Sequence, residues 1–332
     1  MVYSVTLISI DEKEDRVKRY ASRIRYEVKS EIYGCCIKLL TDSHEVRDRW
    51  SENLYSMSQN IRSHGRLFVF DDPKEDPDTV YYDPQSKTVF LLNIRYYGWI
   101  KSLALSVAGD ILEDEHDVYS IHGACLDTGC GGTCILGGSG AGKTTQTYGL
   151  LRDPDVRVVA DDWFFSRVYG PNILAYGSEK SFYIRADLAT IWPEFHDLVD
   201  RAEFDSERRA VVDLRWVVGK GRILPITTLR TVIILTRTSG AGTGAGTGTG
   251  TGTGAGASTT CEETDPESAL ESMEKNGYYN PHFLVKNSYK ASLRRQFFHD
   301  LLSRTRIFTI KTAGTPEETQ QVIRNIGGPG GV

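Results

Sequence analysis

The sequence predicts an α/β protein with a phosphate-binding loop at the start of one of its helices. Short apolar runs rich in β-branched residues alternate along the chain with stretches of helical spacing, which is typical of sheets covered by helices. Residues 137–144 read GGSGAGKT and fit G-x-x-x-x-G-K-[ST], the pattern of a loop that cradles phosphates. The apolar run VRVVADD then ends in two acids, Asp161 and Asp162.

Composition is that of an ordinary globular protein. Of 332 residues, 40% are hydrophobic and 25% are charged, which is the usual balance for such chains. A net charge of −5 gives no electrostatic reason to expect a nucleic-acid partner. The first residues lack the pattern of a signal peptide, and no apolar run approaches the ~20 residues that span a bilayer. We therefore expect a cytoplasmic protein without a membrane partner.

Residues 1–95 predict a mixed α/β region. VYSVTLISI, RLFVF and the two halves of TVYYDPQSKTVFLLNI read as strands, and EVRDRWSENLYSMSQNI has helical spacing. No catalytic signature occurs here, so a packing or substrate-presenting role is favoured. Over residues 96–120, apolar residues recur at steps of three to four and predict a connecting helix with one apolar face.

Residues 121–326 predict the phosphate-binding domain. IHGACLD and TCIL read as strands before the loop, and TTQTYGLLRDPD continues it as a helix. Four later runs predict further strands, NILAYG, KSFYIR, RAVVDLRWVV and TLRTVIIL. ASLRRQFFHDLLSRT predicts a helix and RIFTIKT a last strand. Between the run TLRTVIIL and the predicted helix ASLRRQFFHDLLSRT, glycine alternates with Ala or Thr, which predicts a flexible loop over 239–259.

Three clustered cysteines, Cys125, Cys130 and Cys134, raise the alternative of a metal site. Their spacing contains no C-x-x-C pair, and Cys134 falls within the apolar strand before the loop. Because free cysteine behaves as a small buried hydrophobe, we expect buried thiols in preference to a metal centre.

The glycine-rich loop has a defined phosphate chemistry. Its glycines let the backbone turn several N–H groups toward an anion, and the following helix adds its positive end. Lys143 supplies a charge to the outer phosphates, and the Thr144 hydroxyl is a ligand for Mg²⁺. The predicted nucleotide-binding residues are Gly137, Gly138, Ser139, Gly140, Ala141, Gly142, Lys143, Thr144 and Thr145.

The acidic end of VVADD predicts a second element of the same site. An apolar strand that ends in an acid commonly holds Mg²⁺ in phosphate-loop proteins, directly or through water. With two adjacent acids, one can bind the metal while the other accepts a proton from a hydroxyl or water. The alternative is a strand-end turn with two solvated aspartates.

Three segments, IHGACLD, GGSGAGKTT and VVADD, resemble in order and spacing the catalytic domain of HPr kinase/phosphorylase. The core of that family is related to the core of phosphoenolpyruvate carboxykinases. The resemblance covers roughly residues 120–240. It implies a P-loop kinase core of this type, accompanied here by a smaller N-terminal α/β region.

The resemblance also implies site residues. Asp161 would bind Mg²⁺, Asp162 would be the base, and His122 would lie beside them, with ATP and Mg²⁺ as cofactors. From the residues alone, a structural role for His122 is favoured. The family's downstream E-[IV]-R-G-[LV]-G segment has no convincing counterpart, although Glu179 and Arg185 lie in roughly that region. The N-terminal region does not match the bacterial sensor kinase, so the protein HPr itself is not implied as the acceptor.

These features predict an ATP- and Mg-dependent kinase that transfers phosphate to a serine-like hydroxyl of a protein, peptide or small molecule. Two alternatives stay open, a carboxykinase-type lyase on the related core and a nucleotide-binding regulator without turnover. The sequence does not choose between ATP, GTP, ADP and pyrophosphate. It also leaves open the acceptor and whether the chain forms a homo-oligomer.

Overall fold

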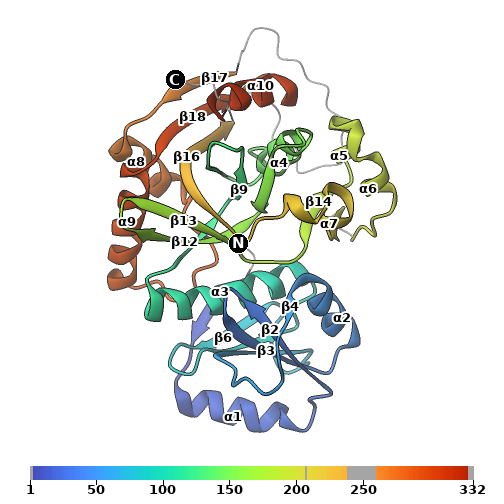
Figure 1. Ribbon diagram of the computed structural model, residues 1–332. Coiled ribbons are helices and arrows are strands. Elements are labelled where there is room, and N and C mark those ends of the chain that lie inside the picture. Colours follow the sequence, from blue (N-terminus) through green and yellow to red (C-terminus); the bar gives the residue numbers. More distant parts are fainter. Residues whose placement is uncertain (1–2, 206–207, 238–258, 328–332) are drawn as a thin grey trace. The chain divides into compact units, whose positions relative to one another are not determined.

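The computed structural model describes residues 3–205, 208–237 and 259–327 (Figure 1). It is a mixed α/β structure with several sheets, which confirms the predicted class. The chain forms two compact units. The N-terminal unit comprises Met1–Ser120, Ser178–Ser181 and Asn280–Arg295, and the loop unit comprises Ile121–Gly177, Phe182–Tyr279 and Gln296–Val332.

The N-terminal unit contains a seven-stranded sheet of order β1-β6-β7-β5-β3-β2-β4. Its central strands β3, β5 and β7 run parallel, while β6 and β7 form the antiparallel pair predicted around the Asp-Pro turn. The strands are β1 (Val5–Leu7), β2 (Tyr26–Ile32), β3 (Cys35–Thr41), β4 (Tyr55–Ser56), β5 (Gly65–Phe70), β6 (Thr79–Asp83) and β7 (Thr88–Leu92).

Helices cover both faces of this sheet. They are α1 (Ile10–Ala21), α2 (His44–Asn53) and α3 (Tyr97–His116), and Figure 1 shows α1 and α3 on opposite faces. On the α1 face, Tyr20 stacks on Phe70 with 5.1 Å between ring centroids. On the α3 face, Gly65 leaves no room for a side chain, because an added methyl group would lie 2.5 Å from Val107.

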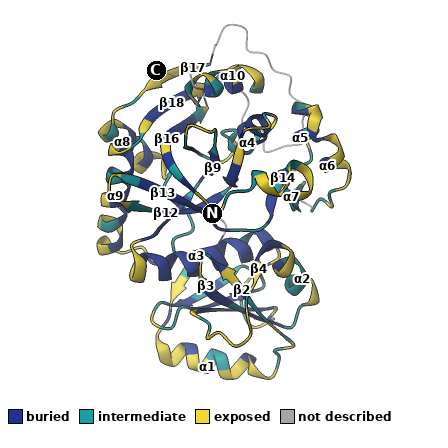
Figure 2. Ribbon diagram, in the orientation of Figure 1, coloured by how far each residue is buried: buried dark blue, intermediate teal, exposed yellow. Residues whose placement is uncertain are grey.

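Helix α3 differs from the predicted helix with a single apolar face, since nearly all of its residues are buried (Figure 2). Its buried acids Asp110 and Glu113 are paired with bases from the segment 280–295. Lys290 Nζ lies 2.6 Å from Asp110 Oδ1, and Arg294 Nε lies 2.8 Å from Glu113 Oε2. Burial opposes the charge of Lys290, but its hydrogen bond and ion pair with Asp110 prevail and raise its pKa. These charges belong to a structural ion-pair network.

The loop unit is built on a nine-stranded sheet with the path β11-β9-β10-β16-β13-β12-β8, to which β18 adds beside β16 and β17 beside β18. The strands are β8 (Tyr119–His122), β9 (Ala124–Asp127), β10 (Gly132–Gly137), β11 (Arg157–Ala160), β12 (Trp163–Tyr169), β13 (Asn172–Gly177), β16 (Ile226–Arg237), β17 (Thr260–Glu263) and β18 (Arg306–Thr312). A separate pair consists of β14 (Phe182–Arg185) and β15 (Arg209–Val212).

The helices of this unit are α4 (Lys143–Leu151), α5 (Leu188–Ile191), α6 (His196–Asp200), α7 (Arg215–Val218), α8 (Pro266–Asn276) and α10 (Pro316–Gly327). Helix α9 (Ser288–Ser303) begins among the residues of the N-terminal unit and ends in this unit. Short 3₁₀ turns occupy Pro193–Phe195 and Lys220–Arg222. The predicted strand RAVVDLRWVV is wrong in its second half, because α7 takes residues 215–218 after β15 ends. Among the described residues, no helix is long and apolar enough to cross a membrane.

The predicted flexible loop at 239–259 falls almost entirely in 238–258, which lies outside the described residues. The described chain resumes at Thr259, and β17 begins at Thr260.

Candidate functional site

One edge of the sheet in the loop unit gathers the three motifs that the sequence singled out. Strand β9 runs antiparallel to β10 and to β11, with Ala124 opposite Ile135 and Cys125 opposite Ala160. The start of β9 therefore lies at the same edge as the ends of its two neighbours. His122, the loop after Gly137 and the acidic pair after Ala160 meet there, although about 40 residues of sequence span them.

The loop itself has the backbone conformation that its glycines suit. Gly140 and Gly142 adopt φ values of 78° and 100°, a region that side chains disfavour. At Gly137 the chain passes so close to β16 that an added methyl group would lie 2.6 Å from the Leu235 carbonyl oxygen. Strand β10 ends at Gly137 and helix α4 begins at Lys143, so the loop between them joins a strand to a helix N-terminus as the motif requires.

Lys143 closes the loop from inside. Its Nζ donates to the Gly137 carbonyl at 2.7 Å and to the Gly138 carbonyl at 3.3 Å. Burial lowers the pKa of Lys143, and the negative charge of Asp162 acts in the opposite direction. The ammonium is therefore held at the mouth of the loop, within electrostatic reach of an acid from the neighbouring motif.

The other residues of the loop are either accessible to solvent or held by contacts with residues outside the loop. Ser139 and Gly140 are exposed, and residues 141–145 are half-buried. The carbonyl of Thr145 accepts a hydrogen bond of 2.8 Å from the Trp192 indole, which fixes the first turn of α4. Ala141 packs on the edge of the core beneath the loop. The Thr144 hydroxyl makes no hydrogen bond to another described residue, so it can serve as a ligand.

The two aspartates have different environments. Asp161 is buried, and its Oδ2 accepts the backbone N–H of Tyr183 at 2.8 Å. Asp162 is 39% exposed, and its Oδ1 lies 3.3 Å from Nε2 of His122. Asp162 is thus much more exposed than Asp161, which argues against a turn carrying two equivalent solvated aspartates.

His122 occupies the last position of β8, and its side chain contacts a residue of the acidic pair. Its backbone N–H donates to the Tyr279 carbonyl at 3.4 Å, while its ring contacts Asp162. The glycine that follows it, Gly123, has no space for a side chain. An added methyl group would lie 2.7 Å from Leu136 Cδ2 and 2.8 Å from the Ile135 carbonyl oxygen.

Gly123→Ala is therefore expected to destabilise the loop unit by about 1–3 kcal/mol through overpacking against β10. Urea unfolding followed by circular dichroism measures this loss. Gly221→Ala is the matched control, because a methyl group there meets no atom within 4 Å. Equal unfolding midpoints for the two variants would show that the contact with β10 yields without cost.

Two residues named for the missing downstream segment do not join this site. Glu179 belongs to the N-terminal unit, where Lys101 Nζ lies 3.2 Å from Oε1 and Asn53 Nδ2 lies 3.0 Å from Oε2. Arg185 is exposed on β14 and forms an ion pair of 3.2 Å with Asp187. A role of Arg185 as a clamp for a phosphoryl group therefore has no support from its contacts.

The cysteine cluster is a packing feature. Cys125 and Cys134 are buried and face each other across β9 and β10, and burial raises the pKa of both thiols. High pKa values disfavour the thiolates that bind metals. The expectation of buried thiols is wrong for Cys130, which is exposed in the turn between the two strands.

Three residues that the sequence did not single out approach the site, Arg237 and Tyr278 at the loop and Tyr279 at His122. Arg237 ends β16 and places Nη1 3.5 Å from the Gly140 carbonyl oxygen. Tyr278 and Tyr279 follow α8, and a methyl group on Gly138 would lie 3.6 Å from Cε1 of Tyr278. The local sequence GYYN does not identify these tyrosines as site residues. Their position depends on the packing of α8, which lies far beyond the loop in the chain.

The oxygen donors at this edge suit Mg²⁺. Hydroxyl and carboxylate oxygens of Thr144 and Asp161 are the ligand types that this ion takes from proteins. Within the described residues, the single cluster of three metal-ligating side chains is Asp110, Glu113 and Asp114, and there the bases Lys87 and Lys290 neutralise the acids. A metal ion at the loop would thus complete its coordination with phosphate oxygens and water, as Mg²⁺ commonly does.

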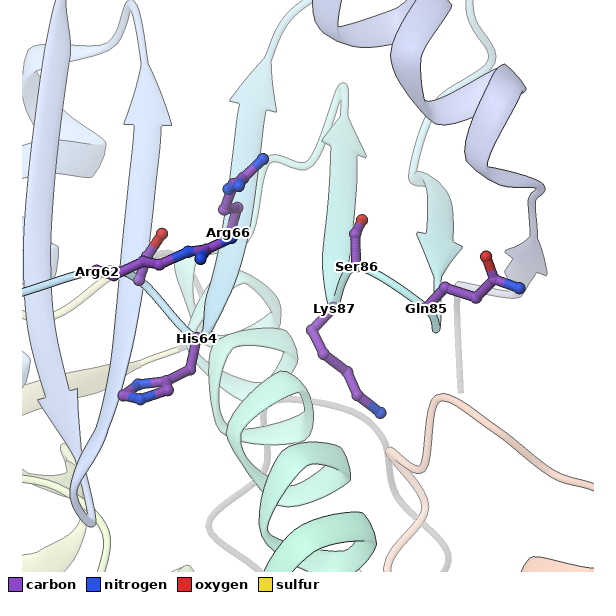
Figure 3. Close-up of a pocket in the computed structure, with 7 residues that line it drawn as sticks. Arg62, His64, Arg66, Gln85, Ser86 and Lys87 are labelled. Carbon is purple, nitrogen blue, oxygen red and sulfur yellow. The ribbon is translucent and has the colours of Figure 1, made fainter.

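A hollow lies in the N-terminal unit. It has a volume of about 470 Å³ and basic walls, and Figure 3 shows the side chains around it. Lys87 contacts Asp110 at 2.7 Å, and His64 Nδ1 accepts the backbone N–H of Cys36 at 2.8 Å. The hollow contains none of the predicted site residues. Its lining is Arg62, Ser63, His64, Arg66, Gln85, Ser86 and Lys87.

No family model and no curated protein sequence matches this chain. Among solved structures it is similar to the HPr(Ser) kinase/phosphatase from Coxiella burnetii, at 10% sequence identity and a TM-score of 0.32. The match covers 62% of this chain and 88% of that one. A likeness of this strength leaves the function to be argued from the residues of the site.

Proposed function

We propose that the chain is an ATP- and Mg-dependent phosphotransferase with a P-loop kinase core of HPr kinase type. It transfers the terminal phosphoryl group to a serine-like hydroxyl. The observation that carries the proposal is the half-exposed carboxylate of Asp162, 3.3 Å from His122 and within electrostatic reach of Lys143. A phosphate loop by itself serves hydrolysis, switching or transfer. A carboxylate placed at its mouth supports chemistry in which a base accepts the proton of an attacking hydroxyl or water.

The loop binds and orients the nucleotide. Backbone N–H groups of the loop would donate to the phosphates, except that of Ala141, which donates to the Gly138 carbonyl at 3.2 Å. The N-terminus of α4 adds its partial positive charge. Lys143 contacts the outer phosphates, while Thr144 and Asp161 would hold Mg²⁺. When bound, Mg²⁺ neutralises charge that develops on the phosphate oxygens during transfer. The hydrogen bond from Tyr183 keeps the buried Asp161 carboxylate in one orientation.

Asp162 and His122 act on the acceptor. The carboxylate of Asp162 accepts the proton of the acceptor hydroxyl as the hydroxyl oxygen attacks the terminal phosphorus. The bond from that phosphorus to the bridging oxygen breaks, and ADP leaves. His122 contacts the same carboxylate through Nε2 and orients it. The backbone N–H of His122 donates to the Tyr279 carbonyl, so the segment that follows α8 supports the pair. The acceptor is a hydroxyl on a protein, a peptide or a small molecule.

The test is transfer of label from [γ-³²P]ATP to hydroxyl acceptors in the presence of Mg²⁺. Serine, serine-containing peptides and small proteins form one panel, and oxaloacetate is a separate substrate. An acid-stable phosphate ester on a hydroxyl is the expected product. Decarboxylation of oxaloacetate would assign the lyase alternative instead. Tight nucleotide binding without turnover on any acceptor would assign the regulator.

A further inference from the structure

Tyr278 is held against the phosphate loop by the way in which α8 ends. Gly277 follows the helix with φ 65°, and the Tyr278 N–H donates to the Met273 carbonyl at 2.9 Å. This turn directs the phenol toward Gly138. A methyl group on that glycine would lie 3.6 Å from Cε1 of Tyr278 and 4.0 Å from its hydroxyl oxygen.

The neighbouring residue anchors the turn. The ring of Tyr279 stacks on Phe298 with 4.2 Å between centroids and an interplanar angle of 2°. Its hydroxyl donates to Glu274 at 3.2 Å, and its carbonyl accepts the backbone N–H of His122. The segment 277–279 therefore contacts the site at two points. Tyr278 lies against the loop, and Tyr279 binds His122, the partner of Asp162.

The two tyrosine hydroxyls differ in their partners. That of Tyr279 has Glu274, whereas that of Tyr278 makes no hydrogen bond with the residues that the structure describes. Tyr278 is half-buried, so its hydroxyl is only partly solvated. A donor in such a place gains most from a charged acceptor, and a phosphate oxygen is the strongest one that this site would receive.

The position of Tyr278 along the loop indicates which phosphate it meets. Lys143, whose side chain serves the outer phosphates in such loops, places its ammonium on the carbonyls of Gly137 and Gly138. Tyr278 faces Gly138 as well. Ammonium and phenol thus converge on the end of the loop that holds the outermost phosphate, away from the nucleoside.

We propose that Tyr278 donates a hydrogen bond to the terminal phosphoryl group and forms the wall beside it, so that the site distinguishes nucleoside triphosphate from diphosphate. The inference rests on the proposed function, because it requires a nucleotide in the loop. It goes beyond that function by assigning the recognition of the transferable group to a residue outside all three sequence motifs.

Isothermal titration of Mg·ATP and Mg·ADP with Tyr278→Phe tests the assignment. Affinity for Mg·ATP should fall about 10- to 100-fold, the usual worth of a hydrogen bond to a charged group. Affinity for Mg·ADP should not change. Tyr279→Phe is the matched control, since it removes a hydroxyl that binds Glu274, and it should leave the ratio of the two affinities as in the wild type. Thermal unfolding of both variants verifies that the fold is intact.

Each outcome bears on a different statement. An unchanged ATP-to-ADP ratio in Tyr278→Phe overturns the assignment. Wild-type protein that binds nucleotide but transfers nothing contradicts the proposed phosphotransferase and leaves the role of Tyr278 testable by binding. A wild type that binds no nucleotide overturns both. Phosphate found on Tyr278 by mass spectrometry would make its hydroxyl an acceptor in cis and overturn its role as a donor.

Discussion

Asp162→Asn is expected to retain Mg·ATP binding and to lose phosphoryl transfer by ~10²–10⁴-fold, the usual share of a general base. An asparagine keeps the size of the side chain and a hydrogen-bonding contact with His122, but it cannot accept the proton of an attacking hydroxyl. Because Asp162 is half-exposed, this change leaves no buried group without a partner. The loss should therefore appear in the chemical step and not in folding.

Asp161→Asn should give a different defect. The buried Oδ2 that accepts the Tyr183 N–H has a counterpart in the amide oxygen, so the local backbone is preserved. The negative charge that attracts Mg²⁺ is removed, and the concentration of Mg²⁺ needed for half-maximal turnover should rise. We separate the roles in this way because one acid is buried and the other is exposed, and the family resemblance implies the same assignment.

Single-turnover transfer and isothermal titration of Mg·ATP, run on both variants, separate the two defects. Asp187→Asn is a suitable control, since it alters an exposed acid of the same unit that pairs with Arg185. If Asp161→Asn and Asp162→Asn both bind and react like the wild type, neither acid takes part in the reaction and the proposed mechanism has no base.

The phosphate loop could be located from sequence because its signal is local. Glycines, a lysine and a threonine at fixed spacing specify a backbone path, and the structure has the expected positive φ values at Gly140 and Gly142. The convergence of His122 with the acidic pair needed more, because it depends on β9 running antiparallel between β10 and β11. The sequence resemblance implied that convergence, whereas composition and periodicity did not.

Other features depend on contacts between residues far apart in the chain. Glu179 lies within a predicted strand-rich stretch, yet its hydrogen bonds with Lys101 and Asn53 place residues 178–181 in the N-terminal unit. The buried acid Asp110 of α3 is paired with Lys290, which lies 180 residues beyond it in the chain. Hydrophobic periodicity reports which face of an element is apolar, but it contains no information about such distant partners.

Lys143→Ala is expected to weaken Mg·ATP binding by about 2–5 kcal/mol, the typical cost of truncating one member of a partly buried charge pair. This corresponds to roughly 30- to 5,000-fold in Kd. The loss arises because the backbone of the loop still donates to the phosphates, but the ammonium that would contact the outer phosphates is gone. Turnover should fall with binding, since the same ammonium stabilises the phosphoryl group during its transfer.

The fold should tolerate this change. In the free protein, burial lowers the pKa of Lys143, so the unfolded chain holds that proton more tightly and the ammonium opposes folding at neutral pH. Its removal should leave the melting temperature unchanged or slightly raised.

Lys220→Ala, which alters an exposed lysine of the same unit, should change neither the melting temperature nor the affinity. Isothermal titration of Mg·ATP measures the affinity of the two variants, and thermal unfolding measures their melting temperatures. A Lys143→Ala protein that binds Mg·ATP like the wild type would mean that the loop does not hold the nucleotide.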